Sequence, residues 1–320
     1  MFQYVVKRLL ILIPVFFGIT IIIFTLIHIM PGDPYSTMMD PGLSAADKEQ
    51  MLEAIGYYDP LPVQYARWLS RAFAGDLGYS THYLQPVTTV IGEKLGNTLL
   101  LSVSVLILSV LLAVPLGVIS AVRQYSALDY FATILAFIGI SIPSFFLALG
   151  VLKIFAFDLG WFPISGLRTI GANYTGLRAL LDLAHHAVLP ILVLTVIQMA
   201  SLMRYTRSSM LEAIQMDYTR TARAKGLSEH TVIYKHALRN SMISVTTLIT
   251  ISLGNLLSGA VLTETVFGWP GMGTLMYQAI GNRDYSLVTA CALLLTVFIL
   301  LSNLLADILY AVVDPRIRYQ

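Results

Sequence analysis

The chain has 320 residues, 57% of them hydrophobic and only 12% charged, and it carries a formal net charge of +2. Soluble proteins contain about 45–50% apolar residues, so this composition and a mean hydropathy of +0.75 exclude an ordinary soluble domain. The apolar residues come in runs of about 20, the length of a helix that crosses a bilayer. The one cysteine, Cys291, lies in such a run, so a disulfide framework is excluded as well.

Six such runs predict six membrane-spanning helices in an all-α polytopic membrane protein, a single domain over residues 1–320. They cover residues 9–30, 98–122, 130–157, 187–205, 243–265 and 286–310. The first run is about 22 residues long, which exceeds the core of a signal peptide, and it ends in HIMPGDP without a small-residue cleavage site. We therefore interpret it as an uncleaved anchor. Pro115, Pro143 and Pro190 predict bends in the second, third and fourth spans, because proline removes a backbone donor.

Lysine and arginine are distributed unequally between the two sides of these spans. The segments 1–8, 123–129, 206–242 and 311–320, together with Arg204 at a span end, hold 12 of the 20 Lys and Arg residues. The opposite segments are nearly twice as long and hold 7 of them. Because basic segments stay in the cytoplasm, both termini and the 206–242 segment are predicted to be cytoplasmic.

The 31–97 segment on the other side is too long to be a simple connection, so we expect a structured extracytoplasmic insertion. One helix is predicted from Ser44 to Gly56, and a second from Pro62 to just before Gly75. Two interpretations are open for this insertion. It forms a cap over the spans, or it offers a docking surface for another protein.

The 206–242 segment contains a helix–glycine–helix pattern. Ser208 or Ser209 is expected to cap a helix that runs to Lys225, and Gly226 suits the left-handed position that ends a helix. Ser228 then caps a second helix. The result is an elbow with an apolar ridge and basic flanks, which fits either anionic lipid headgroups or a groove on a cytoplasmic partner. The ridge and the glycine favour the partner, because a polybasic lipid patch needs neither.

Ionisable residues are scarce within the predicted spans, where an ion-coupled carrier would need them. His28, Lys153 and Asp307 lie near span ends, and Asp307 is expected to pair with a cytoplasmic base. Small or polar residues are the candidates for lining a pathway through the spans. These candidates are Ser141, Gln198, Asn255 and Ser258.

Motifs of catalysis and metal binding are missing from the sequence. It has no Gly-Lys dipeptide, which excludes a nucleotide phosphate loop. It also lacks a zinc-type His/Glu helix motif and a nucleophile elbow. His185 and His186 form the one histidine pair, but neighbouring residues on a helix point in different directions. We therefore predict no enzyme activity and no metal or cofactor bound by this chain.

The stretch that begins at Thr206, TRSSMLEAIQMDYTRTARAKGLSEHTVIYKHALRN, resembles the cytoplasmic coupling loop of binding-protein-dependent ABC importers, in the version found in dipeptide and oligopeptide permeases. Further motifs of that family's B-type permease subunit follow in order along nearly the whole chain. They are HIMPGDP after the first span, GDLGYS at 75–80, LTETVFGWPGMG at 262–273, NRDYS at 282–286 and DPRIR at 314–318.

The wider family has a Glu-Ala-Ala-x-x-x-Gly core in this loop. The register that fits here is Arg220-Thr221-Ala222 followed by Gly226, so arginine stands in place of the glutamate. Arg239 stands where a proline is common in the family. Contacts of the family's glutamate are therefore not carried over to Arg220, whereas the glycine elbow is.

The resemblance implies a type I ABC importer-like fold and a place as one of two non-identical permease subunits in a bacterial or archaeal inner membrane. Each elbow would sit in a cleft of one of two cytoplasmic ATPase subunits, which bind ATP and Mg. An extracytoplasmic binding protein would deliver peptides to the outer face, and no nucleic acid is involved. The residues expected to couple to the ATPase are Arg220, Thr221, Ala222, Arg223, Ala224, Lys225, Gly226, Leu227, Val232, Ile233 and His236.

Other functions are weighed against this one. Within the family, nickel or peptide-like compounds are alternative substrates, since nothing in the spans selects among them. Outside it, an ion-coupled secondary transporter is disfavoured by the scarcity of ionisable residues. A membrane scaffold or signalling protein with a lipid-bound basic loop would need no ATPase.

Overall fold

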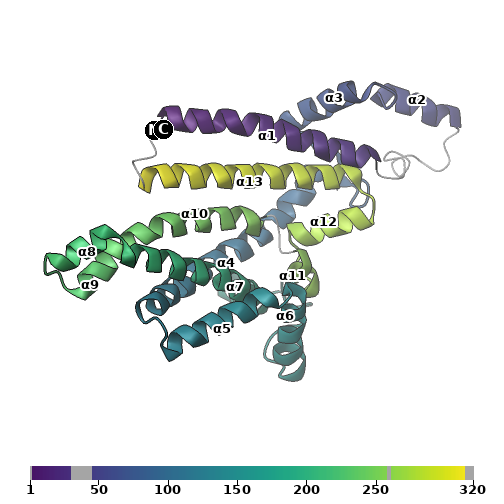
Figure 1. Cartoon of the computed structure of the whole chain (residues 1–320). Coiled ribbons are helices and arrows are strands. Elements are labelled where there is room, and N and C mark those ends of the chain that lie inside the picture. Colours follow the sequence, from purple (N-terminus) through teal and green to yellow (C-terminus); the bar gives the residue numbers. More distant parts are fainter. Residues whose placement is uncertain (1, 30–44, 258–260, 314–320) are drawn as a thin grey trace.

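The computed structural model describes residues 2–29, 45–257 and 261–313. Within these ranges the chain is helical apart from its loops and one antiparallel hairpin, β1 (Tyr79–Ser80) and β2 (Gln85–Pro86). The long helices lie side by side (Figure 1). The start of α1, the end of α13 and the α8–α9 elbow lie together at one end, called here the elbow end, and α12 lies toward the opposite, hairpin end.

The first and last long helices pair in opposite directions. α1 (Phe2–Ile29) packs along α13 (Tyr285–Val313), and the guanidinium of Arg8 lies 3.2 Å from the carboxylate of Asp307. This ion pair confirms that Asp307 pairs with a base near the span ends. It also fixes the start of α1 beside the end of α13.

Both helices predicted in the insertion are present, as α2 (Ala45–Ile55) and α3 (Leu61–Phe73). Gly56 ends the first with φ +75°, the left-handed conformation that favours glycine. α3 packs against the side of α1. The hydroxyls of Thr20 and Tyr65 lie 2.8 Å apart, and the ring centroids of Phe24 and Trp68 lie 5.8 Å apart.

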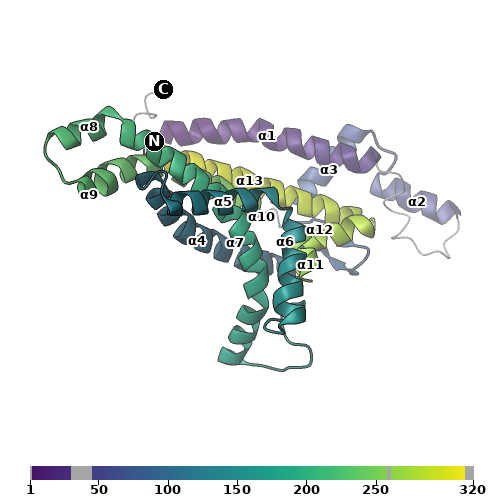
Figure 2. The same ribbon diagram turned by 60° about the horizontal axis from the view of Figure 1, so that its bottom comes forward.

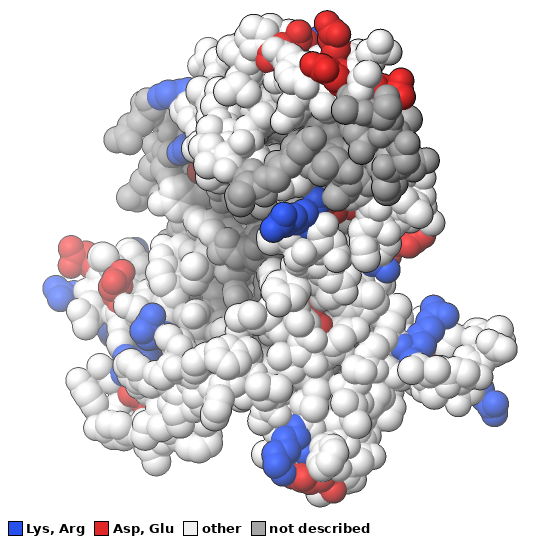
Figure 3. Space-filling view, turned by 90° about the vertical axis from the view of Figure 1, so that its right-hand side faces the viewer, with Lys and Arg blue, Asp and Glu red and all other residues white. Residues whose placement is uncertain are grey.

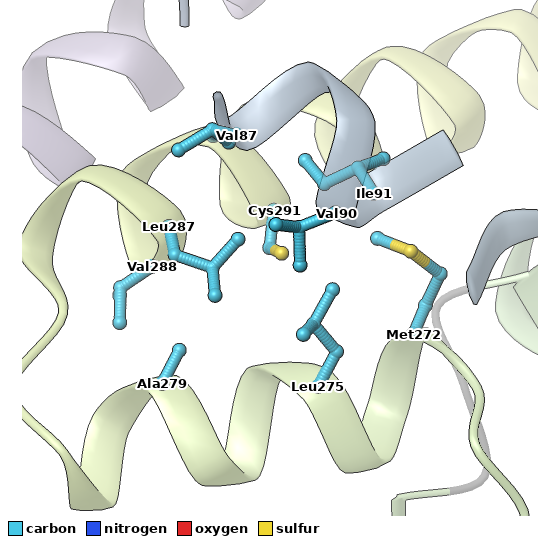
Figure 4. Close-up of a cluster of buried hydrophobic side chains, with 10 residues drawn as sticks. Val87, Val90, Ile91, Met272, Leu275, Ala279, Leu287, Val288 and Cys291 are labelled. Carbon is cyan, nitrogen blue, oxygen red and sulfur yellow. The ribbon is translucent and has the colours of Figure 1, made fainter. Parts of the chain in front are cut away.

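The second long helix, α4 (Val87–Val122), begins well before the hydrophobic run predicted from residue 98. Its first turns carry polar residues and fell outside the hydropathy pattern. Val87, Val90 and Ile91 nevertheless point into a cluster shared with α12 and α13 (Figure 4). Burial of one face therefore extends the helix into the segment assigned to the insertion.

The third predicted span is broken at Pro143. α5 (Ala127–Ser141) is followed by α6 (Ser144–Val151) and its π-helical continuation η1 (Leu152–Asp158), and the two parts are bent by 105°. Figure 2 shows α6 turning away from α5 to run beside α7. The bend predicted from Pro143 is confirmed.

The elements after this break are a long helix, the elbow and a series of helices that leads to α13. α7 (Gly176–Gln215) extends well beyond both limits of the predicted span 187–205. The elbow follows as α8 (Asp217–Ala224), α9 (Glu229–Thr231) and the π-helical η2 (Val232–Ala237), which runs into α10 (Leu238–Leu257). α11 (Val261–Val266) and α12 (Met272–Gly281) then lead to α13.

The span count over the described residues differs from the six predicted. Four helices are long and apolar enough to cross a membrane, α1, α4, α7 and α13, or five if the bent α5–α6 pair is one span. The predicted span 243–265 falls on α10, on residues 258–260 outside the described ranges, and on the short α11.

Two glycines allow neighbouring helices to approach closely. A Cβ on Gly117 of α4 would lie 2.7 Å from the side chain of Thr206 on α7. A Cβ on Gly254 of α10 would lie 2.9 Å from Ser302 on α13. Packing of this kind needs small residues, because no hydrophobic effect drives helices together in lipid and their association depends on close contact between backbones.

Candidate functional site

The elbow starts where α7 ends. Met216 has an extended conformation and breaks the helix, and the Thr219 hydroxyl donates to the carbonyl of Ala213 at 2.8 Å across the break. Ser208 and Ser209 therefore do not cap a new helix, as the sequence suggested, but lie inside α7. The helix continues through them because Met210 and Ala213 are buried against neighbouring helices.

The turn of the elbow has the predicted form. Gly226 has φ +76° after the end of α8, and no described atom lies within 4 Å of the position of a Cβ on it. The Ser228 hydroxyl accepts a hydrogen bond from the amide of Thr231 at 3.4 Å and caps the second helix. Glycine is thus required by backbone conformation rather than by space.

An ion pair closes the elbow. The guanidinium of Arg223 on α8 donates to both carboxylate oxygens of Glu229 on α9, at 3.0 and 2.7 Å. The hydrogen bonds from Arg223 hold the pKa of Glu229 below its ordinary value, and the same bonds raise the pKa of Arg223. Both side chains are largely exposed, so the pair contributes orientation more than stability.

The inner face of the elbow is packed against the chain itself. Ile233 and Ala237 of η2 lie in a cluster with Val118 of α4 and Met210 of α7. Val232 is fully buried. The apolar ridge predicted to meet a partner is therefore covered by the ends of the spans. An amphipathic pattern indicates that one face of a helix is buried, but it does not indicate what covers that face.

The outer rim of the elbow is exposed. We call this set the elbow rim. It consists of Arg220, Thr221, Arg223, Ala224, Lys225, Gly226 and Leu227. Ala222 faces inward and is buried, and His236 is half-buried.

The four candidates for the pathway are only partly described. Ser141 is exposed at the break between α5 and α6, and Gln198 is half-buried on α7. These two helices touch nearby, where a Cβ on Gly139 would lie 3.0 Å from Ala200. The side chain of Asn255, and Ser258 altogether, lie outside the described residues.

A buried ion pair that the sequence did not indicate lies behind the elbow. Arg207 of α7 donates to both carboxylate oxygens of Asp129, at 2.7 and 2.9 Å, and Asp129 is buried at the start of α5. The hydroxyl of Ser120 on α4 and the amide of Tyr125 also donate to this carboxylate. One carboxylate thus joins the ends of three helices next to the elbow.

Two motifs that are far apart in the sequence meet at the hairpin end. Asp284 of NRDYS is fully buried and accepts hydrogen bonds from the Ser80 hydroxyl of GDLGYS and from the amide of His82. The Tyr83 hydroxyl donates to Gln278 of α12 at 2.9 Å. The β1–β2 hairpin is thereby fixed to the ends of α12 and α13.

A buried acid within the predicted span 243–265 was also missed. Glu264 of α11 is 1% exposed and accepts a hydrogen bond from the Thr98 hydroxyl of α4 at 3.0 Å. Among the residues that the structure describes, no group of three or more His, Cys, Asp or Glu side chains is arranged to hold a metal ion.

Two family models together match nearly all of the chain. Residues 113–319 match the model of the binding-protein-dependent transport system inner membrane component, and residues 1–104 match the N-terminal model of the same kind of membrane component. The chain belongs to this family. The permease is thus a multi-pass component of an inner membrane, and it works with an ATPase and a binding protein. ATP is hydrolysed on the partner subunits and not on the permease.

Relatives of the permease match over their full length. The oligopeptide transport system permease protein AppB of Bacillus subtilis is 42% identical over 320 residues, which is all of both chains. The dipeptide transport system permease protein DppB of Escherichia coli K12 is 38% identical over 338 aligned positions, again covering all of both chains. The glutathione transport system permease protein GsiC of Escherichia coli O6:H1 is 37% identical, with the same coverage.

A solved structure supports the fold of the permease. The MetNI methionine ABC transporter, in inward-facing conformations, includes a chain that is similar with a TM-score of 0.55 and 20% identity. The similarity covers 71% of the permease and 97% of that chain. At this identity it shows the fold alone, an ABC importer permease fold.

Proposed function

We propose that the chain is one of two non-identical permease subunits of an ATP-driven peptide importer. In this proposal it forms half of the translocation pathway and carries the elbow that receives the ATPase. The observation that carries the proposal is the exposed elbow rim around Gly226, presented on a base buried against the spans. Peptides are the proposed substrate class because relatives covered over their full length are permeases of oligopeptide and dipeptide transport systems. Nickel and peptide-like compounds stay alternatives within the family.

The ATPase contact is proposed for the elbow rim and not for the whole predicted set. Lys225 and Leu227 are exposed on both sides of the glycine turn, so a cleft could receive both a charge and an apolar side chain. Val232 and Ile233 are buried beneath them and shape the elbow from inside. Closure of the ATPase pair on ATP would then move the rim, and with it the ends of α7 and α10.

The elbow end is proposed to face the cytoplasm, together with both termini. Three observations support this orientation. The start of α1 and the end of α13 lie at the elbow end (Figure 1). The segments richest in Lys and Arg are those at the two termini and in the elbow. Seen from the hairpin end, the surface is mostly uncharged, charges of both signs are scattered over it, and acidic side chains gather over α2 at the top (Figure 3).

Reversing one charge on the elbow rim tests the ATPase contact. Lys225→Glu is expected to weaken co-purification of the ATPase, because the new carboxylate would repel an acidic surface that receives Lys225. The loss is expected to grow as salt is lowered, since this repulsion then acts over a longer range. Arg223→Glu is less informative, since it also breaks the pair with Glu229. ATPase retention is measured over a series of salt concentrations.

Arg168→Glu is the matched control. Arg168 is also an exposed base, but it lies in the loop before α7, on the far side from the elbow. This variant is expected to keep the ATPase at every salt concentration. Equal retention by Lys225→Glu and Arg168→Glu would exclude the elbow rim as the electrostatic contact.

A further inference from the structure

The acid of LTETVFGWPGMG is buried among hydrogen-bond donors. Glu264 is 1% exposed, and one carboxylate oxygen accepts from the Thr98 hydroxyl at 3.0 Å. The other accepts from the amide of Thr274 at 3.0 Å. The Thr98 hydroxyl in turn accepts from the amide of Met272 at 2.7 Å. These amides belong to the first turn of α12, where the partial positive charge of a helix start favours a carboxylate.

The glycines of the same motif make room for this carboxylate. A Cβ on Gly271 would lie 2.4 Å from a Glu264 oxygen, and a Cβ on Gly273 would lie 2.8 Å from the other. Real side chains do not approach so closely. The acid and the two glycines are therefore one unit, a carboxylate and the cradle that fits it.

The turn that follows the acid is bound to two other parts of the chain. The indole of Trp269, fully buried, donates to the carbonyl of Asn97 on α4 at 3.2 Å, and the Asn97 amide donates to the carbonyl of Pro270 at 2.9 Å. The amide of Gly166, in the loop between η1 and α7, donates to the carbonyl of Phe267 at 3.0 Å. The cradle thus joins α4, α11, α12 and that loop.

What depends on the cradle is the position of α12. Met272, Leu275 and Ala279 of this helix fill the cluster with the start of α4 and with α13 (Figure 4). Tyr277 and Ile280 of this helix are exposed, and the helix lies toward the hairpin end (Figure 1). Without the carboxylate, the Thr274 amide and the Thr98 hydroxyl would lose their acceptor, which is costly for polar groups inside the protein.

We propose that Glu264 is a positioning residue for transport. Its carboxylate holds the start of α12 against α4 and so sets the hairpin end in the shape that substrate entry requires. This proposal depends on the proposed function in one respect only, namely that the complex imports its substrate. A competing role is that of a proton carrier, because a buried acid in a span is what an ion-coupled transporter uses. The two roles predict different activities for a variant in which a neutral amide replaces the acid: a positioning residue would still work, and a proton carrier would not.

Glu264→Gln and Glu264→Leu separate these roles in the assembled complex. Glutamine keeps a side-chain oxygen that can accept from the Thr274 amide. Glu264→Gln is therefore expected to retain most uptake of labelled alanine oligopeptides and most stimulation of ATP hydrolysis by the binding protein. Leucine offers no acceptor, so Glu264→Leu is expected to lower both by about tenfold or more. The amount of co-purified ATPase is expected to stay unchanged in both variants, since the elbow is at the other end.

Two outcomes would overturn the proposal. If Glu264→Gln is as inactive as Glu264→Leu, the charge itself is required and the acid does more than position α12. If Glu264→Leu is as active as the wild type, the cradle is not needed. If the wild-type complex takes up no peptide, the proposed substrate class is wrong. Stimulation of ATP hydrolysis by the binding protein would then still test the role of Glu264.

A second pair of variants covers the case in which Glu264→Leu fails to assemble. Thr98→Val removes the hydroxyl that bridges Glu264 and Met272 and keeps the shape of the side chain, whereas Thr98→Ser restores the hydroxyl. Thr98→Val is expected to lower stimulation by the binding protein several-fold, and Thr98→Ser to keep it. Equal stimulation of the two variants would contradict the role of the cradle.

Discussion

Replacing Gly226 with valine is expected to abolish ATP-driven transport while the subunit stays in the membrane. Gly226 has φ +76°, which costs about 1–2 kcal/mol for a residue with a Cβ and more for a branched one. No described atom lies within 4 Å of the Cβ position, so we expect the strain to fall on the backbone of the turn. Relief of that strain would displace Lys225 and Leu227, the two residues next to the glycine. Transport and membrane content are measured together.

Gly171→Val is the matched control for this strain. Gly171 has φ +79°, is exposed, and likewise has no described atom within 4 Å of a Cβ position, but it lies in the loop before α7. It is expected to transport like the wild type. If Gly226→Val transports fully, or if both variants lose transport alike, the elbow is not the coupling element.

The second large effect is expected from the buried ion pair behind the elbow. Asp129→Asn removes the charge that compensates Arg207, whose side chain is 25% exposed, and is expected to cost about 3 kcal/mol of stability. The Asp129→Asn/Arg207→Leu double variant is expected to lose less than the sum of its single variants, because the two residues are directly coupled. The thermal midpoint of the detergent-solubilised subunit measures both.

An exposed pair in the same chain provides the comparison. Lys153 and Asp158 lie 2.7 Å apart, with side chains 69% and 45% exposed. Asp158→Asn is expected to change stability by less than about 1 kcal/mol, since neither side chain is buried within the protein as Asp129 is. Equal shifts of the midpoint for Asp129→Asn and Asp158→Asn would show that burial of Asp129 does not set its contribution.

Local signals in the sequence predicted the elbow turn well and its surroundings poorly. Gly226 and Ser228 act through their own backbone and the next turn, so their roles could be read from spacing alone. Ser208 and Ser209 carry the same capping chemistry, yet tertiary packing of α7 overrides it. Val232 and Ile233 were correctly placed on an apolar face, but the pattern could not tell a partner from the chain itself.

The polar contacts that hold the helix ends together could not be predicted from spacing. The pairs join residues 78, 204 and 166 positions apart, namely Arg207 with Asp129, Ser80 with Asp284, and Thr98 with Glu264. No periodicity links such positions. Ser80, Asp284 and Glu264 lie in motifs that the family resemblance marks without a physical reason, and the structure supplies that reason.

Site-specific cross-linking from Leu227 tests the central claim most directly. Leu227→Cys places a thiol on the elbow rim, and the native Cys291 is buried and does not compete for reagent. Ile233→Cys, on the covered inner face, is the control. We expect Leu227→Cys to cross-link to an ATPase subunit in the assembled complex, at a rate that ATP changes, and Ile233→Cys not to do so. An assembled, transporting complex in which Leu227→Cys forms no cross-link to the ATPase would contradict the account.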